Sequence, residues 1–182
     1  SEMCIRDRIL TEHMKVDVHE LIRDRNICVV TVRDTRKALS ALSAAFFDHP
    51  AERMKMIGIT GTNGKTTTAF LTAGILQEAG YRVGMIGTIE SYDGRRRETV
   101  KNTTPESCEI HRLLFRMVEN ECDCCVMEVS SQGIALQRTA DVFFDIGVFL
   151  NIEPDHIGKG EHATFSEYLY CKSRLMRQCG IG

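Results

Sequence analysis

The sequence predicts an α/β fold in which a mostly parallel sheet carries helices on both faces. Short apolar runs alternate along the chain with segments whose apolar residues recur at helical spacing. Two runs, CCVMEVS (124–130) and FFDIGVFLN (143–151), are almost continuously apolar, which is typical of parallel strands buried on both faces. A glycine-rich stretch between an apolar run and a helical segment, residues 58–70, fits the same alternation.

The N-terminal part contains one predicted strand and one predicted helix. Residues 1–8 match no pattern that follows and resemble a translated sequencing adapter, so we expect a non-native scar and exclude them from fold reasoning. The β-branched run ICVVTV (27–32) predicts a strand. Asp34 is a candidate N-cap for a helix over residues 35–47. The expected apolar face of that helix consists of Ala38, Leu42, Ala45 and Phe46.

A domain boundary is predicted at DHPAERM (48–54), which breaks the helical pattern. We expect residues 9–50 to be the end of a preceding domain with its linker, and residues 51–182 to be a truncated central domain. The chain is therefore expected to be an internal piece of a longer protein.

The central domain is predicted to begin with a strand, a loop and a helix. The strand covers residues 56–60, and the helix runs from 66 to 79. It ends at Gly80, because glycine readily adopts the left-handed conformation that follows a helix end. Residues 82–88 predict the next strand.

Turn and cap residues place three further elements. The polar stretch SYDGRRRET (91–99) predicts a hairpin tip around Asp93-Gly94. Thr104-Pro105 is expected to begin a helix, with threonine as the cap and proline at the first helical position. The last helix is expected to begin at a capping box over residues 164–167.

Composition excludes several classes of protein. The 182 residues are 43% hydrophobic and 26% charged, which fits a soluble globular domain. A formal net charge of −2 provides no basic field for nucleic acid, and no apolar run approaches the roughly 18 residues of a membrane helix. We expect neither partner. Cys122, Cys124 and Cys125 lie in a strand-like run with no second pair at zinc spacing, so we interpret the eight cysteines as reduced thiols.

The stretch GITGTNGKTTTAF (58–70) is predicted to bind phosphate. A loop between a strand and a helix presents backbone N–H groups and the positive helix end, and glycines let the backbone approach phosphate oxygens. Gly64-Lys65-Thr66 adds a mobile cation and a hydroxyl that can ligate Mg²⁺. Ile59 stands where the general phosphate-loop pattern has glycine, so this is not the common GTPase form. The candidate nucleotide-binding residues are Gly61, Thr62, Asn63, Gly64, Lys65, Thr66 and Thr67.

Acidic residues and a histidine follow two of the predicted strands. Glu128 ends one apolar run, and Asp155-His156 follows the other. Because ligands bind at the carboxyl ends of parallel strands, we interpret Glu128 and His156 as metal ligands. A capping or salt-bridged glutamate and an ordinary loop histidine are the alternatives.

Lys172 falls within the apolar stripe of the last helix, and its role stays open on spacing alone. Either its stem covers apolar surface while the ammonium reaches water, or the amine is desolvated and available for chemistry. The expected stripe consists of Phe165, Tyr168, Leu169, Met176 and Cys179.

Three motifs resemble the Mur ligases, in particular the MurE type. GTNGKTTT (61–68) is similar to the ATP loop of that family, NTTPES (102–107) to its substrate loop, and EVSSQGIALQR (128–138) to its EVSSHGLVQHR segment. The resemblance covers residues 28–182. It implies that the chain is the P-loop-type, ATP-binding central domain of a Mur ligase, without the C-terminal domain.

The resemblance also implies roles for single residues. Lys65 would contact phosphate, Thr66 and Glu128 would hold a first Mg²⁺, and His156 with a CO₂-derived carbamate on Lys172 would hold a second. Lys65, Lys172 and His156 would thus be the catalytic residues. The residues that would contact the nucleotide-linked substrate are Asn102, Thr103, Thr104, Ser130 and Arg138. For Thr104 helix capping, and for Arg138 a solvated surface charge, are the alternatives.

The chain departs from the family pattern at three places. Gln132 replaces histidine, Leu136 stands where the family has a substrate-contacting glutamine, and DHIGKGEH (155–162) replaces DHLDYHG. Folylpolyglutamate synthases share GTNGK but usually continue with Gly-Ser. Cyanophycin synthetases and the Mur-like subunit that amidates lipid II carry a similar loop, so they remain alternatives, as does a nucleotide-dependent module that ligates nothing.

The activity implied by the resemblance is ATP-dependent amide-bond formation in peptidoglycan precursor synthesis. The γ-phosphoryl group would pass to the carboxylate of UDP-N-acetylmuramoyl dipeptide, and the amine of lysine or diaminopimelate would attack the acyl phosphate. The partners would be that nucleotide-linked peptide and the amino acid. We expect a monomer in the bacterial cytoplasm, and no ligation by these 182 residues alone.

Overall fold

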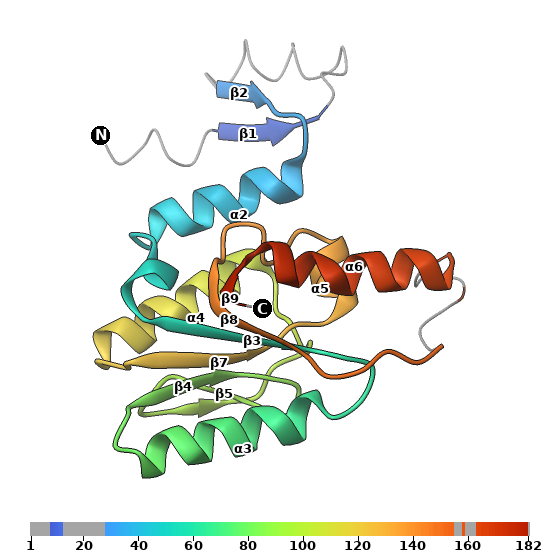
Figure 1. The fold of residues 1–182 in the computed structure, drawn as a ribbon. Coiled ribbons are helices and arrows are strands. Elements are labelled where there is room, and N and C mark those ends of the chain that lie inside the picture. Colours follow the sequence, from blue (N-terminus) through green and yellow to red (C-terminus); the bar gives the residue numbers. More distant parts are fainter. Residues whose placement is uncertain (1–7, 13–27, 155–157, 159–162, 182) are drawn as a thin grey trace.

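The computed structural model describes residues 8–12, 28–154, 158 and 163–181, and Figure 1 shows how they are arranged. A small parallel sheet of β1 (Arg8–Thr11) and β2 (Cys28–Thr31) precedes helix α2 (Thr35–Phe46). A short 3₁₀ helix, η2 (Pro50–Arg53), leads from α2 into the main sheet. The predicted domain boundary falls here and stays a prediction.

The main sheet has seven strands in the order β6-β5-β4-β7-β3-β8-β9. From β4 to β9 all neighbours are parallel, whereas β4–β5 and β5–β6 are antiparallel. The strand pairing confirms the predicted, mostly parallel sheet and the predicted hairpin around Asp93-Gly94, which β5 and β6 form. The strands are β3 (Lys55–Thr60), β4 (Val83–Ile86), β5 (Ser91–Tyr92), β6 (Arg97–Glu98), β7 (Cys124–Glu128), β8 (Phe144–Phe149) and β9 (Cys179–Ile181).

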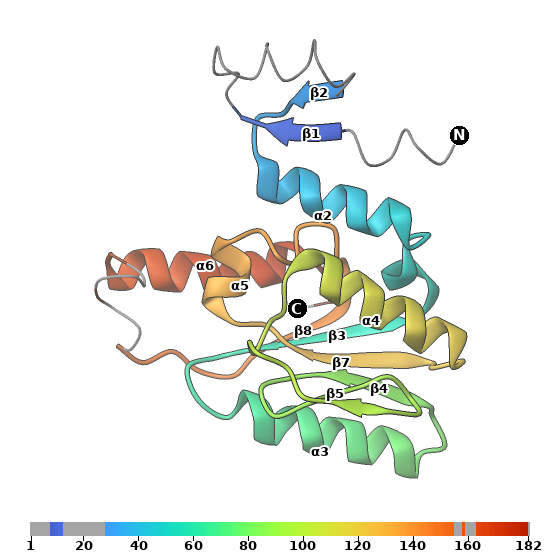
Figure 2. The same ribbon diagram turned by 180° about the vertical axis from the view of Figure 1, so that it is seen from behind.

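Helices cover both faces of this sheet, as predicted. In Figures 1 and 2, α3 (Lys65–Glu78) lies on one face, while α4 (Ser107–Glu119), α5 (Ser131–Ala135) and α6 (Phe165–Arg177) lie on the other. Each face has its own buried cluster: Ile57, Ile59, Val126 and others under α3, and Met56, Cys125, Met127 and others under α4. Successive residues of a strand thus point into opposite buried clusters, which is why these strands are apolar throughout.

Cap residues set the helix ends largely where the sequence places them. The Asp34 carboxylate accepts a hydrogen bond from the Lys37 N–H at 2.9 Å, and the Thr164 hydroxyl accepts one from the Glu167 N–H at 3.1 Å. Gly80, just past the end of α3, has a φ of 91° in the left-handed region. No helix in the described part of the chain is long and apolar enough to cross a membrane.

The predicted apolar face of α2 is wrong. Leu42 and Phe46 are exposed, at 52% and 79%, while Ser40, Ser43 and Ala44 are buried. Small residues on α2 let this helix pack closely over α4. The face with small residues is therefore buried instead of the face with the larger apolar residues.

Two predictions about α4 and α6 also need correction. Helix α4 begins at Ser107 with Glu106 at the N-cap, so Thr104 is not its cap; the Thr104 hydroxyl instead bonds to the end of β7. In α6, Phe165 and Leu169 are exposed, and the buried face consists of Tyr168, Cys171, Lys172 and Leu175.

Candidate functional site

The carboxyl ends of β3, β4, β7 and β8 meet at one edge of the sheet, and the candidate site residues lie in the segments that follow them. Residues 61–64 connect β3 to α3, and residues 87–90 follow β4. Residues 129–130 follow β7, and residues 150–154 follow β8. Four sequence-distant stretches are therefore brought together.

The loop after β3 has the geometry of an anion site. Gly64 is the N-cap residue of α3 with a φ of 84°, which lets the chain turn sharply and point the first amide groups of a 14-residue helix into the loop. The Asn151 side chain, just past the end of β8, fixes the loop: its Oδ1 accepts from the Thr62 and Asn63 N–H groups, each at 3.1 Å, and its amide donates to the Asn63 carbonyl. The loop is thus held in place from the neighbouring strand.

Lys65 lies over this loop. Its ammonium donates to the carbonyl oxygens of Gly61 at 2.9 Å and Thr62 at 3.0 Å. A pocket of about 310 Å³ opens beside it and is lined by residues 62–67 together with Thr88 and Thr103. The sequence-predicted nucleotide residues from Thr62 to Thr67 therefore share one concave surface.

Glu128, the last residue of β7, is fully buried, and its carboxylate accepts three hydrogen bonds. The donors are the Thr66 hydroxyl at 2.9 Å, the Thr88 N–H at 2.9 Å and the Thr88 hydroxyl at 3.0 Å. A carboxylate and a hydroxyl at the start of a phosphate loop are the hard oxygen ligands that Mg²⁺ prefers, so these residues fit that ion. In these contacts Glu128 neither pairs with a cation nor caps a helix, so neither of the two alternatives describes it.

The second half of the predicted metal set lies largely beyond the described residues. Asp155 and His156 both fall outside them. Within the described ranges, no three His, Cys, Asp or Glu side chains gather closely enough to hold a metal ion. The role assigned to His156 accordingly stays a prediction.

Lys172 is buried against the phosphate loop. The residue is 1% exposed, and its ammonium donates to the Gly61 carbonyl at 2.7 Å and lies 4.6 Å from the centre of the Tyr168 ring. The Tyr168 hydroxyl in turn lies 3.0 Å from the Thr62 hydroxyl. The interpretation in which the Lys172 ammonium reaches water is therefore wrong, and α6 presents this amine to the loop.

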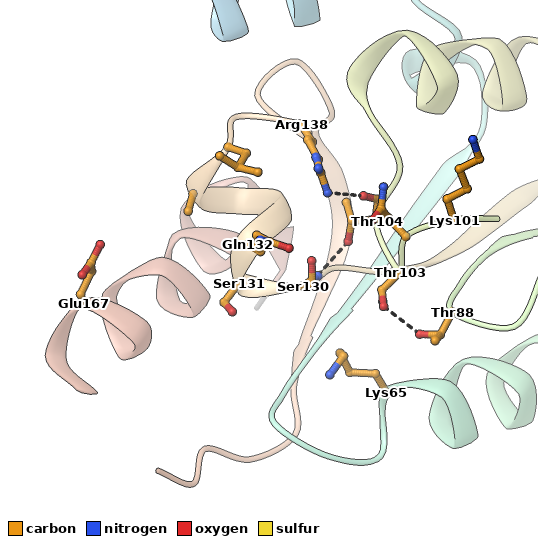
Figure 3. Close-up of a pocket in the computed structure, with 13 residues that line it drawn as sticks. Lys65, Thr88, Lys101, Thr103, Thr104, Ser130, Ser131, Gln132, Arg138 and Glu167 are labelled. Atoms are coloured by element: carbon orange, nitrogen blue, oxygen red, sulfur yellow. Dashed lines mark hydrogen bonds between the residues drawn. The ribbon is translucent and has the colours of Figure 1, made fainter. Parts of the chain in front are cut away.

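A second pocket of about 440 Å³ lies beside the first, and Figure 3 shows the residues around it. It contains all five residues predicted to contact a nucleotide-linked substrate. Lys65, Thr88 and Thr103 line both pockets, so the two spaces share a wall. The residues that line the second pocket are Lys65, Thr88, Lys101, Asn102, Thr103, Thr104, Ser130, Ser131, Gln132, Ala135, Leu136, Arg138 and Glu167.

Buried hydrogen bonds fix the wall of this second pocket. The Thr104 hydroxyl donates to the Glu128 carbonyl at 3.1 Å and accepts from the Ser130 N–H at 2.9 Å. Arg138, only 8% exposed, donates to the Thr104 carbonyl at 3.0 Å and pairs with the Glu106 carboxylate. Arg138 is therefore not a solvated surface charge, and it holds the segment that contains Thr104 and Glu106, while the Thr104 hydroxyl ties this segment to the end of β7.

Sequence reasoning missed several residues at this edge. Thr88 follows β4 just as Glu128 ends β7, so the rule about strand ends could have found it. The same rule could have found Asn151, which lies two residues past the end of β8. Tyr168 carried no such signal, because its hydroxyl group meets the loop only after α6 has packed beside it.

Residues 59–182 match the family model of the Mur ligase middle domain, which covers more than half of the chain. The chain belongs to the Mur ligase family. The match confirms the predicted fold class. It also confirms the family resemblance that GTNGKTTT (61–68) and the two substrate-side motifs indicated.

Among Mur ligases, the curated relatives to which this chain is similar are of the MurE type. The chain is 44% identical over 153 residues to UDP-N-acetylmuramoyl-L-alanyl-D-glutamate–2,6-diaminopimelate ligase of Clostridium perfringens, covering 84% of the chain and 31% of the relative. It is also 44% identical over 149 residues to the corresponding L-lysine ligase of Enterococcus faecalis, covering 81% and 29%. The chain thus spans about a third of the length of these relatives.

Solved structures show the same fold. A UDP-N-acetylmuramoyl-L-alanyl-D-glutamate–2,6-diaminopimelate ligase superposes with a TM-score of 0.66 at 22% identity, over 83% of this chain and 31% of that one. The MurF ligase of Thermotoga maritima in complex with ADP superposes with a TM-score of 0.55 at 18% identity, over 95% and 34%. At these identities the likeness concerns the fold alone.

Proposed function

We propose that this Mur ligase domain belongs to an ATP-dependent enzyme that adds an amino acid to UDP-N-acetylmuramoyl dipeptide in peptidoglycan precursor synthesis. One observation carries the proposal: a phosphate-loop pocket and a second polar pocket share the wall formed by Lys65, Thr88 and Thr103. A ligase of this class needs ATP and a carboxylate substrate side by side. The printed names of the Clostridium perfringens and Enterococcus faecalis relatives point to the same substrates.

The chemistry assigned to the loop follows from its contacts. Lys65 and the N-terminal amides of α3 bind the triphosphate, and Lys65 turns from the Gly61 and Thr62 carbonyls to the phosphate oxygens. Thr66 and Glu128 would hold Mg²⁺, which would supply positive charge next to the transferring phosphoryl group. These groups favour breaking the bond between the β- and γ-phosphates.

The substrate carboxylate lies in the second pocket, oriented by Arg138, Ser130 and the 102–104 loop. It attacks the γ-phosphorus, ADP leaves, and an acyl phosphate forms. The amine of the added amino acid then attacks the acyl carbon, inorganic phosphate leaves with the bonding electrons, and the ammonium proton passes to solvent. No side-chain nucleophile takes part, so the protein contributes positioning and electrostatics.

We further propose that the Lys172 amine carries a CO₂-derived carbamate that provides oxygen ligands for a second Mg²⁺, together with His156. Support comes from the placement of Lys172, whose amine is buried beside the loop that would hold the triphosphate.

The added amino acid follows from the names of the relatives. The Clostridium perfringens diaminopimelate ligase and the Enterococcus faecalis L-lysine ligase are each 44% identical to the chain over the aligned residues. We propose one of these two amino acids as the second substrate.

The test uses the complete protein that carries this sequence. It is incubated with ATP, Mg²⁺, bicarbonate, UDP-N-acetylmuramoyl-L-alanyl-D-glutamate, and either lysine or diaminopimelate. Phosphate release that requires both the dipeptide and an amine supports the ligase. Release in the absence of both overturns it in favour of a nucleotide-driven module.

A further inference from the structure

The carboxylate of Glu128 sits in a space that only glycine at position 87 leaves open. A Cβ added to Gly87 would lie 2.4 Å from the Glu128 Oε1 atom, well inside contact distance. Gly87 and Thr88 directly follow β4, which pairs with β7 in parallel register up to Ile86 and Met127. The backbone after β4 therefore forms a cradle around a side chain from the next strand.

Thr88 supplies two of the three hydrogen bonds that this carboxylate accepts. Its N–H bonds to Oε1 at 2.9 Å, and its hydroxyl bonds to Oε2 at 3.0 Å. A carboxylate has about four lone-pair positions. With Thr66 on Oε2 as well, the remaining position is on Oε1, so the donors fix the direction in which the carboxylate can meet a cation.

The number of hydroxyl protons determines how Thr88 is hydrogen-bonded to Thr103, in the 102–104 loop. The Thr88 and Thr103 hydroxyl oxygens are 3.1 Å apart. A dashed line joins the two side chains in Figure 3. A hydroxyl has one proton, and a carboxylate can only accept. The Thr88 proton is therefore directed at Glu128, and Thr103 donates to Thr88. The result is a directed chain from Thr103 through Thr88 to Glu128.

We propose that Thr88 is a positioning residue that fixes the Glu128 carboxylate for Mg²⁺ and couples it, through Thr103, to the substrate pocket. The inference rests on the proposed function for the identity of the metal and of the substrate. Thr88 itself is exposed at the wall between the two pockets, so its side chain is not needed to fill the core.

The test compares Thr88→Val with Thr88→Ser in the complete protein. Valine keeps the shape and the N–H but removes the hydroxyl. Binding of a fluorescent N-methylanthraniloyl ATP is titrated with MgCl₂ and, separately, measured in excess EDTA. We expect Thr88→Val to raise the Mg²⁺ concentration for half-maximal binding about tenfold, the lower end of effects seen when a ligand-orienting partner is removed. Thr88→Ser should stay within about twofold of the wild type, and binding in EDTA should not change.

Two further variants sharpen the result. Thr99→Val, an exposed threonine outside both pockets, controls for loss of a hydroxyl in general. Gly87→Ala pushes on Oε1 and should raise the Mg²⁺ requirement in the same direction as Thr88→Val. In a double-mutant cycle, Thr88→Val and Thr103→Val should be less than additive in their effect on KM for the dipeptide, because both break one chain.

The outcomes separate this inference from the proposed function. If the wild-type protein binds the nucleotide with Mg²⁺ dependence and Thr88→Val needs no more Mg²⁺, the positioning role is wrong while the ligase proposal stands. Equal effects of valine and serine would also overturn it. If the wild type shows no Mg²⁺-dependent binding at all, the proposed function fails, and this inference fails with it.

Discussion

The Lys172 ammonium lies 2.7 Å from the Gly61 carbonyl oxygen, although 111 residues separate the two along the chain. The contact is buried, and it brings the middle of α6 onto the phosphate loop after β3. Lys172 is therefore part of the loop's surroundings, and its removal should affect the loop and the chemistry there together.

Lys172→Ala should lower the ligation rate by at least about 100-fold in the complete protein, because it removes a charged group from the site of phosphoryl transfer. Steady-state rates with Mg²⁺, ATP and the dipeptide would measure this. A short-chain carboxylic acid added to the variant should restore part of the activity if a carbamate supplies the missing oxygen ligands. Arg177→Ala, an exposed cation near the end of the same helix, is the control. An unchanged rate in Lys172→Ala would remove the carbamate proposal.

Tyr168→Phe tests the link between α6 and the loop. The ring stays in place beside Lys172, but the hydroxyl that meets Thr62 at 3.0 Å is lost. We expect a loss of about 1 kcal/mol in the free energy of unfolding and a higher KM for ATP. Urea unfolding and initial rates check the two effects. Tyr170→Phe, on the exposed side of α6, should change neither value. A Tyr168→Phe protein that matches the wild type in both would show that the hydroxyl contact has no energetic role.

Arg138→Lys tests how the substrate pocket is held. The guanidinium reaches both the Thr104 carbonyl and the Glu106 carboxylate, and a lysine ammonium lacks the planar fork needed for both. We expect KM for the dipeptide substrate to rise about tenfold, equivalent to about 1.4 kcal/mol. Arg112→Lys, in an ion-pair cluster with Glu98 and Glu109, is the matched control. Equal KM values for Arg138→Lys and wild type would contradict the assigned role.

His111 predicts a dependence of stability on pH. Its ring is fully buried on α4 without a hydrogen-bond partner in the described part of the chain, and desolvation lowers its pKa from 6.5 to about 4, against an opposing effect of Asp141. Between these values the unfolded chain binds a proton that the folded chain does not, so stability falls as the pH decreases from about 6.5 towards about 4, by up to about 3 kcal/mol.

Urea unfolding at pH 7 and pH 5 measures this effect. His111→Met, which cannot titrate, should show a smaller loss on going to pH 5 than the wild type. His49→Asn is the comparison, because His49 is exposed and asparagine tolerates its left-handed backbone, with a φ of 47°. The charge of His49 is the smallest of the causes that shift the pKa of His111, so this variant should keep most of the pH response. The lowered pKa values of Asp93, Glu98 and Asp145 act in the same direction, but only as the pH falls below the ordinary values of these carboxyl groups, 3.8, 4.5 and 3.8. A full pH response in His111→Met would refute the assignment.

Much of the fold could be predicted because local signals and long-range packing agree here. The apolar runs at 124–130 and 143–151 became central parallel strands, and Asp34, Gly80 and Thr164 lie at helix ends as expected. The phosphate loop was identifiable because it uses backbone geometry, which glycines reveal directly in the sequence.

The failures occurred where packing overrides pattern. Leu42 and Phe46 predict the buried face of α2, yet the smaller Ser40 and Ala44 allow the closer helix contact. Thr104 has the chemistry of a cap, but a buried carbonyl at the end of β7 accepts its proton instead. Tyr168 could not be assigned to the loop from spacing, because its partner Thr62 is 106 residues away.

The common wall of the two pockets has a practical consequence for inhibitor design. A compound that joins a triphosphate mimic to a carboxylate mimic by a short tether would span the wall between the pockets, which contains Lys65 and Thr103. Since the second half of such a molecule binds at a high effective concentration once the first is seated, two weak fragments could combine into a tight, slowly dissociating ligand.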